Sequence, residues 1–578
     1  MPVLQTYRGI LVALLLTAAT LTVYHGVAAF DFINLDDNIY IYENRHVQGG
    51  LSRDSVTWAF SNNTAGMWIP LTWLSYLLDI TLHGVDPGAM HLTNVGLHLL
   101  NVLILCALLC SLTGTFWTSA FVAGCFALHP MHVESVAWIT ERKDVLSTLG
   151  FLLTLWQYGR FARHPTAGRY LVALMLYIFT LMAKPMYVTL PFLMLLLDYW
   201  PLQRYSAESL RQSGIRLKGT AVRYLVVEKL PFFFLTVVGT ALTYWSFQQT
   251  VAWMHPIDIP LDVRLTTAAT AYLKYIGKLF WPANLAVLYP YHPLADWPQM
   301  LTALGLLAAI SAGVVWRMRQ SPFLFVGWFW FLGLLVPVIG LVNAGSHAMA
   351  DRFSYGSFIG LYIMLAWGVT QVLSGWQRRH WLLLPLVLIL AIGMMTASHR
   401  QVQYWADSVT LYTQSLKNTR DNWFLHNSLG NALGRQGQTE AAIAQFRKAL
   451  LLKPDYAAAH NNLGVSLGRV GQTQAAVARF QEAVRISPTY ADAHYNLGVA
   501  LSAQGRLEDA LGHYLEAIRI RPEHGRAHNN AGGILLHIGH LQEARKHYAA
   551  ALRIDPRDEK ARLNLEGVAE RLAAQGTQ

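Results

Sequence analysis

Four prolines recur every 34 residues near the end of this chain, at Pro454, Pro488, Pro522 and Pro556. Residues 1–400 follow a different pattern, in which long apolar runs alternate with short polar connections. The whole chain is 54% hydrophobic and 13% charged, whereas soluble domains are about 25% charged. We therefore predict an all-α protein, with a polytopic membrane domain over residues 1–400 followed by a helical solenoid.

Eleven apolar runs in the first 400 residues are candidate spans, because a membrane-spanning helix needs about 20 apolar residues. They begin near residues 9, 92, 115, 145, 169, 187, 230, 299, 323, 354 and 381. Basic residues are concentrated in four of the connections, around Arg160, Arg211, Arg317 and Arg378. With a cytoplasmic N-terminus, all four connections lie in the cytoplasm, as the positive-inside rule requires. The formal net charge of +11 therefore reflects orientation, and we do not expect nucleic-acid binding.

An odd number of spans places the C-terminal repeats outside the cytoplasm. The same count places four connecting segments on that outer side: residues 30–91, 129–144, 249–298 and 343–353. Polar residues that carry chemistry together with the repeats should lie in these segments.

The 34-residue units repeat small and large side chains in the same phase. Each unit has a glycine on its first helix and an aromatic residue between two alanines on its second, which in the first unit are Gly430, Ala442, Phe446 and Ala449. This pattern resembles the tetratricopeptide repeat, a helix–turn–helix unit whose small residues allow close helix packing. We predict four repeats over residues 421–556 and a capping helix and tail over residues 557–578. Residues 401–420 would form a linker helix or a degenerate half repeat.

Asparagines recur on the first helices of these units, at Asn462, Asn496 and Asn530. An asparagine ladder on a concave face can hold an extended peptide through its main-chain groups, whatever the peptide sequence. Alternatively, each asparagine satisfies a polar group of the neighbouring repeat. Histidines recur as well, at His426, His460, His494 and His528. We expect these histidines to pack within the array rather than to bind metal, because separate repeats hold them about a helix pair apart.

Two acidic residues, Asp36 and Asp37, follow the first apolar run within a few residues. One carboxylate in this place can act as a general base toward an acceptor hydroxyl, while the other positions the acceptor or helps to bind a cation. The alternative is a solvated pair of acids at the end of a membrane span. The sequence does not decide which of the two would be the base.

The second outer segment carries a dense set of polar residues. His129, His132 and Glu134 lie close together in the sequence, and they could ligate a divalent metal or hydrogen-bond a sugar. Arg142 and the adjacent Lys143 could bind a phosphate at the membrane surface. The alternative is an interfacial cluster whose arginine and lysine reach toward lipid headgroups.

Two further cations lie at the outer ends of apolar hairpins. Lys184 interrupts an apolar stretch, and Arg352 follows Asp351 just before another. A charge at the bilayer centre costs about 2.5–3.5 kcal/mol, so cations at the membrane edge are functional candidates. Both would lie on the same side as Asp36, where they could bind the phosphate of a lipid. For Arg352, an internal pair with Asp351 is the structural alternative.

Taken together, these residues are similar to those of a known family, the transmembrane and tetratricopeptide-repeat-containing proteins. The resemblance covers nearly the whole chain and depends on Leu35-Asp36-Asp37, the run from His129 to Asp144, Lys184-Pro185 and Ala350-Asp351-Arg352-Phe353. It implies a membrane domain of the GT-C class of glycosyltransferases. It also implies transfer of a sugar, mannose in the best-known members, from a polyprenyl-phosphate carrier to protein hydroxyls outside the cytoplasm. Carried onto this sequence, the two aspartates become the catalytic element.

We therefore expect an inverting membrane glycosyltransferase of GT-C type with about 11 spans. Lys184 and Arg352, together with Arg142, would bind the phosphate of the lipid-linked donor, and the repeats would bind the acceptor polypeptide. The donor is the only small molecule that this function requires, apart from the divalent metal considered above. The compact loops favour a bacterial inner membrane with periplasmic repeats.

Two other functions fit the same sequence. One is a non-enzymatic scaffold, in which the spans anchor repeats that assemble an envelope complex. The other is a ligase or polymerase of lipid-linked glycans, whose acceptor is a polysaccharide. Replacing both aspartates with asparagine would leave the scaffold functional, and the chemical nature of the product would identify the ligase.

Overall fold

The computed structural model of this protein describes residues 2–62, 66–212, 220–251, 259–291, 294–341 and 348–576. Among these residues the fold is helical, with one isolated bridge between Tyr289 and Met349. The chain divides into two compact units, Met1–Thr419 and Arg420–Gln578. Parts of the predicted outer segments, residues 63–65, 252–258, 292–293 and 343–347, lie outside the described residues.

Each of the eleven apolar runs forms a helix of the first unit. In chain order they are α1 (Pro2–Val23), α5 (Pro87–Thr113), α6 (Phe116–Leu128), α8 (Arg142–Arg163), α9 (Ala167–Ala183), α10 (Leu190–Tyr199), α12 (Ala221–Val251), α14 (Trp297–Trp316), α15 (Pro322–Leu335), α16 (Ser354–Val372) and α17 (Arg379–Gln403). Within the described residues, six of them are long and apolar enough to cross a membrane, namely α1, α5, α12, α14, α16 and α17. Four more, α6, α9, α10 and α15, are apolar but shorter. The first unit is thus a multi-pass membrane domain, while the count of eleven spans stays a prediction.

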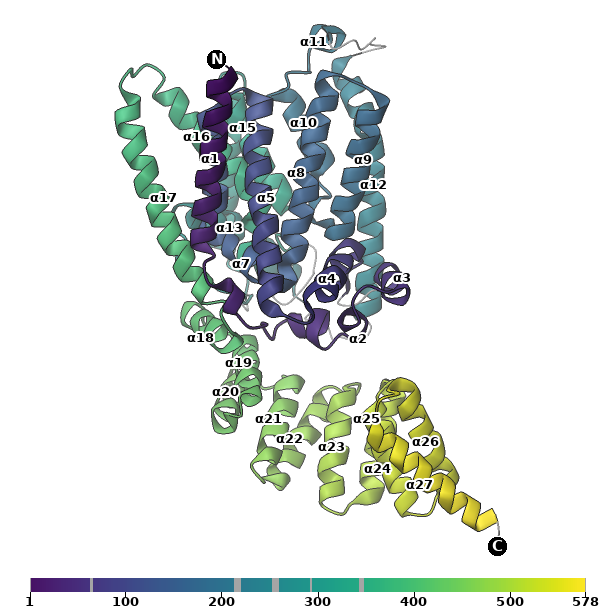
Figure 1. Ribbon diagram of the computed structural model, residues 1–578. Coiled ribbons are helices and arrows are strands. Elements are labelled where there is room, and N and C mark those ends of the chain that lie inside the picture. The colour runs from purple at the N-terminus through teal and green to yellow at the C-terminus, as the bar shows by residue number, and fades with distance from the viewer. Residues whose placement is uncertain are drawn as a thin grey trace. The chain divides into compact units, whose positions relative to one another are not determined.

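The other helices of the first unit are α2 (Arg45–Gln48), α3 (Arg53–Ser61), α4 (Pro70–His83), α7 (Val133–Ala137), α11 (Ala207–Gln212), α13 (Leu261–Phe280) and α18 (Ser408–Asn418). Figure 1 shows the N-terminus and α11 at one end of the bundle, and α2, α3, α4 and α18 at the opposite end. Part of the first predicted outer segment therefore lies at the end of the bundle opposite the N-terminus. Hydrogen bonds between Asp37 and Thr140, His129 and Leu279, and Tyr289 and Asp351 connect described parts of the other three outer segments to it.

Residues 401–420 are divided between two helices of the first unit. Helix α17 extends to Gln403, and α18 follows after a short turn. The hydroxyl of Tyr412 donates a hydrogen bond of 2.6 Å to the carbonyl oxygen of Asn34. The side chain of Asn418 donates one of 2.8 Å to the carbonyl oxygen of Leu285. Helix α18 is thus hydrogen-bonded to two earlier parts of the first unit, at Asn34 and Leu285.

The surface of α17 indicates where lipid lies. This helix exposes a row of large apolar side chains, among them Trp381, Leu384, Ile389 and Ile392. Soluble proteins rarely leave so continuous an apolar surface in water. In a membrane, lipid tails cover these side chains and no apolar surface is exposed to water, which agrees with the membrane assignment.

Close packing around Tyr187 joins the helical turn Pro185–Tyr187, which follows α9, to α8 and α16. Its ring lies against Gly356 of α16, where an added Cβ would be 2.5 Å from the hydroxyl oxygen. The same hydroxyl is 2.6 Å from the hydroxyl of Thr148 on α8. Because Tyr187 follows Lys184 by three residues and Gly356 follows Arg352 by four, this contact fixes the two cations relative to each other.

The second unit consists of tetratricopeptide-like helix pairs, as the 34-residue pattern predicts. The pairs are α19 and α20 (Trp423–Arg435, Thr439–Leu452), α21 and α22 (Ala457–Arg469, Thr473–Ile486), α23 and α24 (Ala491–Ala503, Leu507–Ile520), and α25 and α26 (Gly525–His537, Leu541–Ile554), followed by α27 (Glu559–Gly576). The glycine of each first helix faces the aromatic ring of the second: a Cβ added at Gly430 would lie 2.6 Å from the ring of Phe446. Helix α27 packs its Val568 into a cluster with Leu535 and Tyr548.

Candidate active site

The chain between α6 and α8 is folded into the end of the bundle. It forms the helical turn Pro130–His132, the short helix α7 and the turn Ile139–Glu141. Every residue from His129 to Val145 is buried, although connecting segments normally run over the surface. Since buried charges must be paired to be tolerated, the acids and bases of this segment are expected to form a defined cluster.

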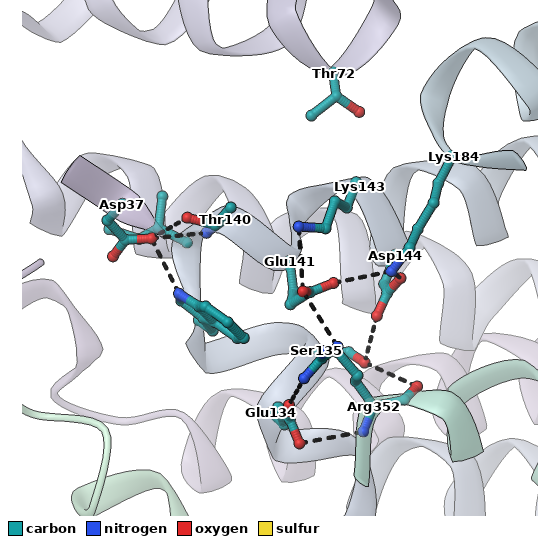
Figure 2. Close-up of polar contacts among 12 residues, drawn as sticks. Asp37, Thr72, Glu134, Ser135, Thr140, Glu141, Lys143, Asp144, Lys184 and Arg352 are labelled. Atoms are coloured by element: carbon teal, nitrogen blue, oxygen red, sulfur yellow. Dashed lines mark hydrogen bonds and ion pairs between the residues drawn. The ribbon is translucent and has the colours of Figure 1, made fainter. Parts of the chain in front are cut away.

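Glu141 is the centre of that cluster (Figure 2). Its carboxylate oxygens lie 3.2 Å from Nζ of Lys143, 3.1 Å from Nζ of Lys184 and 3.3 Å from Nε of Arg352. Burial alone would raise the pKa of Glu141, but the three cations outweigh burial and hold the pKa well below its usual range. Lys184 and Arg352, which the sequence places in two different hairpins, thus meet at one carboxylate.

Two further acids complete the cluster. Asp144 lies 2.5 Å from Nζ of Lys184 and accepts a hydrogen bond of 3.2 Å from the hydroxyl of Ser135. Glu134 binds the guanidinium of Arg352 and accepts a hydrogen bond of 3.2 Å from its main-chain N–H. Three carboxylates therefore balance three cations in a buried network.

The helix ends favour this distribution of charge. Glu141 is the N-cap residue of α8 and Asp144 lies in its first turn, where the helix N-terminus attracts negative charge. Lys184 directly follows the last residue of α9, where the helix dipole favours a cation.

Asp37 is fixed by hydrogen bonds on both carboxylate oxygens. It accepts them from the N–H of Ile33 at 2.8 Å, from the indole of Trp138 at 3.1 Å, and from both the N–H and the hydroxyl of Thr140. The side chain is fully buried, and burial raises its pKa, although the bonds from Thr140 and Ile33 oppose this. Asp37 thus anchors the segment that leads to Glu141.

Asp36 has different surroundings from its neighbour. It is partly exposed, and its carboxylate forms no hydrogen bond or ion pair with any residue that the structure describes. Burial of the surrounding site raises the pKa of Asp36, while Lys143, Arg352 and Lys184 oppose that rise electrostatically. Asp36 is therefore an accessible carboxylate within range of the three cations.

The structure places Arg142 away from this cluster. Its fully buried guanidinium pairs with Asp79 at 2.6 Å and donates to the side chain of Asn94 and to the carbonyl oxygen of Met90, each at 2.9 Å. A third bond of 3.3 Å reaches the carbonyl oxygen of Ser75. Arg142 therefore ties α8 to α4 and α5, and it is not available as a phosphate ligand.

Replacing Arg142 with methionine should destabilise the membrane unit by about 3–5 kcal/mol, because the buried carboxylate of Asp79 loses its counter-charge. Denaturant unfolding in detergent measures the change. Arg317→Met, at an exposed position beyond α14, is the control and should change stability by less than about 0.5 kcal/mol. An Arg142→Met chain with unaltered stability and lost donor binding would instead support the phosphate role predicted from the sequence.

The two histidines of the segment bind main-chain carbonyl groups. Nε2 of His129 is 3.0 Å from the carbonyl oxygen of Leu279, and Nδ1 of His132 is 2.8 Å from that of Phe126. Within the described ranges, no three His, Cys, Asp or Glu side chains are grouped so that they could hold a metal ion. His129, His132 and Glu134 are therefore not brought together as a ligand set.

In the repeats, the asparagines of the predicted ladder form hydrogen bonds with other residues of the array. The amide nitrogen of Asn462 donates 3.0 Å to Asn427, and that of Asn496 donates 2.8 Å to Asn461. The amide nitrogen of Asn530 is 3.5 Å from the hydroxyl of Tyr495. These bonds connect consecutive repeats, so the ladder has the structural role that the sequence left as an alternative to peptide binding.

Two histidine pairs link the paired helices of the last two repeats. Nδ1 of His494 lies 3.1 Å from Nδ1 of His513, and Nδ1 of His528 lies 3.0 Å from Nδ1 of His547. In each pair one ring nitrogen must carry the hydrogen that the other accepts. The contact is therefore compatible with neutral rings and is lost when both rings are protonated.

We expect acidification to loosen these two repeats. Burial and the partner imidazole lower the pKa of His513 and His547. Below about pH 6.5 the unfolded chain therefore binds more protons than the folded one, and stability is lost as the pH falls further. Between about pH 7.5 and about pH 5.5, hydrogen-exchange protection should fall more in residues 491–554 than in residues 423–486. The first two repeats are an internal control, because Gln445 and Arg479 stand where the second histidines would be; equal losses would contradict the expectation.

One member of the cluster is not evident from the sequence. The pattern predicts Lys143, together with Arg142, as a phosphate ligand, but it does not mark Glu141 as the acid shared by the cations. Asp351, the structural alternative partner of Arg352, accepts a hydrogen bond of 3.0 Å from the hydroxyl of Tyr289. The signal available in the sequence is a group of acidic and basic residues directly before an apolar run, from Glu141 to Asp144. This group does not show which charges contact each other in the fold.

Comparison with protein families identifies the repeats. Models described as tetratricopeptide repeat match residues 463–524 and 495–559, and a model described as TPR repeat matches residues 430–471. The second unit is a tetratricopeptide-repeat array.

The chain is also similar to curated proteins at low identity. The protein O-mannosyl-transferase TMTC3 of Homo sapiens is 23% identical over 421 residues, which cover 67% of this chain and 44% of that protein. The protein O-mannosyl-transferase Tmtc3 of Drosophila melanogaster is 24% identical over 461 residues, with coverages of 67% and 48%. The chain thus spans about half the length of these relatives. Among solved structures, MamA is 28% identical over 26% of this chain and 90% of its own, with a TM-score of 0.24.

Proposed function

We propose that this protein is an inverting glycosyltransferase of GT-C type. It would transfer a sugar, mannose or a similar hexose, from a polyprenyl-phosphate donor to hydroxyl groups of exported proteins. The observation that carries the proposal is the convergence of Lys143, Lys184 and Arg352 on one carboxylate, with Asp36 in electrostatic range. The names of the similar curated proteins support the class of reaction.

The charges suit a displacement at the anomeric carbon. The acceptor oxygen attacks that carbon from the face opposite the phosphate, and Asp36 takes the hydroxyl proton. A new carbon–oxygen bond forms, the bond from the anomeric carbon to the phosphate oxygen breaks, and its electron pair remains on the phosphate. Because negative charge grows on that group, cations beside it stabilise the transition state more than the ground state.

The hydrogen bonds favour Asp36 over Asp37 as the base. Both oxygens of Asp37 are occupied by donors of the protein, so an acceptor hydroxyl would have to replace one of them. Asp36 is partly exposed and can receive a proton without breaking the bonds that hold the segment before Glu141.

We propose a matching orientation in the membrane. The N-terminus would lie in the cytoplasm of a bacterium, and the end of the bundle with the charge cluster would face the periplasm, as would the repeats that bind the acceptor polypeptide. A reporter enzyme that is active only in the periplasm, fused after Gln578, should be active. A fusion that is silent there and active in the cytoplasm would reverse the orientation.

The pH profile of transfer should show an acidic limb. A general base works only when it is ionised, and burial raises the pKa of Asp36 above that of an ordinary carboxyl group. Activity should therefore be lost as the pH falls through that raised pKa, which is measured as kcat/KM against pH. An activity that stays constant down to about pH 4 would contradict this assignment.

Intact-mass glycoproteomics of envelope proteins tests the proposed function. Cells that carry the chain should show proteins with added hexose, and cells that lack it, or carry Asp36→Asn, should lose those modifications. Unmodified proteins together with altered lengths of envelope polysaccharide would favour a glycan ligase. Equal modification in all three strains would leave the scaffold function.

A further inference from the structure

The cluster around Glu141 holds three cations close together. Three cations approach one carboxylate, and all of them are largely buried: their side chains are 4% (Lys143), 9% (Lys184) and 12% (Arg352) exposed. Without a central anion, these charges would repel one another in a region of low dielectric. Glu141 supplies that anion from within the chain.

The two other acids could not replace it. Asp144 contacts Lys184, and Glu134 contacts Arg352, so each serves one cation. Glu141 is the acid that touches all three. Lys143 otherwise lies over the ring of Tyr40, with its Nζ 4.9 Å from the ring centre.

The position of Glu141 in the cluster suits a single anion. If its carboxylate leaves, the three cations lose the one acid that contacts all of them, and the net charge of the cluster rises by one. A polyprenyl-phosphate sugar is a phosphodiester and carries one negative charge. Its phosphate can therefore replace the carboxylate charge for charge, with oxygens that accept hydrogen bonds from the same lysines and arginine.

We propose that Glu141 occupies the position of the donor phosphate before the donor binds, and that the donor displaces its carboxylate from Lys143, Lys184 and Arg352. This inference rests on the proposed function. Glu141 then acts as an internal competitor, which keeps the cations in place when no donor is bound and sets the affinity for the donor. A fixed orienting role for Glu141 would have the opposite consequence, because the cations would need it while the phosphate is bound.

Binding of farnesyl methyl phosphate, a phosphodiester with the single charge of the donor, to the full chain in nanodiscs separates these roles. Glu141→Gln removes the competing charge and keeps the shape of the side chain. We expect it to lower the Kd for this diester about tenfold or more, because the diester no longer has to displace a carboxylate and one hydrogen bond to a charged group is worth about that factor. An unchanged or higher Kd in a folded Glu141→Gln chain would overturn the inference.

The matched control is Glu134→Gln, which removes the same charge from the same cluster but contacts only Arg352 among the three cations. We expect it to change the Kd much less than Glu141→Gln does. Equal gains from both variants would show that any lost negative charge suffices, and the inference would be wrong.

A second variant keeps the test decisive if the glutamine variant does not fold. Glu141→Asp retains the charge and shortens the side chain by one methylene, so its carboxylate cannot reach all three cations. Tighter binding of the farnesyl diester supports displacement, and weaker binding supports the fixed role. Failure of the unaltered chain to bind the diester at all would overturn the proposed function and this inference together, whereas normal binding without any gain in the variants overturns the inference alone.

Discussion

An Asp36→Asn chain is expected to transfer sugar about 10²- to 10⁴-fold more slowly than the unaltered chain, because the acceptor hydroxyl loses its general base. The amide has nearly the shape of the carboxylate, and Asp36 forms no hydrogen bond with the described residues that the change would break. Stability and donor affinity should therefore be retained. Steady-state kinetics with a synthetic polyprenyl-phosphate sugar measures kcat and KM separately.

Asp37→Asn is the matched comparison, since the two residues are adjacent and chemically identical. An amide nitrogen at this position would face the donors of Trp138 and Thr140 or of Ile33. We expect a loss of thermal stability, with the fall in activity following the loss of folded protein. A stable Asp37→Asn chain without activity, beside an active Asp36→Asn chain, would make Asp37 the base.

Replacement of Arg352 with glutamine is expected to lower kcat about 10²- to 10³-fold, which is the usual effect of removing one donor that stabilises developing charge. Arg352 reaches Glu141 through Nε and Glu134 through its terminal nitrogen, so the guanidinium lies between two anion positions. The leaving phosphate gains charge in the transition state and would lose this partner. Arg352→Lys should restore part of the rate, because it keeps the charge but not the planar fork.

The control for this prediction is Arg317→Gln, an arginine at the exposed end of α14. It should leave kcat and KM unchanged. If Arg352→Gln folds and keeps full kcat, the guanidinium does not contact the leaving group, and the assignment of the phosphate position fails.

The repeats could be predicted well from the sequence because their packing is local. Gly430 and Phe446 lie on neighbouring helices of one unit, and their contact recurs at every 34-residue step. The period fixes which positions are small and which are large. The direction of the asparagine bonds could not be predicted in the same way, since Asn462 and Asn427 can meet only after the repeats are stacked.

The charge cluster could be predicted less well than the repeats, because its ion pairs join residues that are far apart in the sequence. The sequence offered Arg142 and Lys143 together, and helical geometry turns adjacent side chains about 100° apart, so only one of them can face the site. The decision depends on Asp79 and Asn94, distant partners that bind the arginine. Such pairings leave no local pattern, so the sequence pointed to Lys184 and Arg352 but not to Glu141 as the acid that they share.

The most direct test of the account is a structure of the full chain in nanodiscs with a non-transferable phosphonate analogue of a polyprenyl-phosphate sugar. We predict that the phosphorus lies among Lys143, Lys184 and Arg352, that the carboxylate of Glu141 has moved away, and that Asp36 faces the side of the anomeric carbon opposite the phosphonate. A phosphonate bound elsewhere on the bundle, with the cluster unchanged around Glu141, would contradict the account.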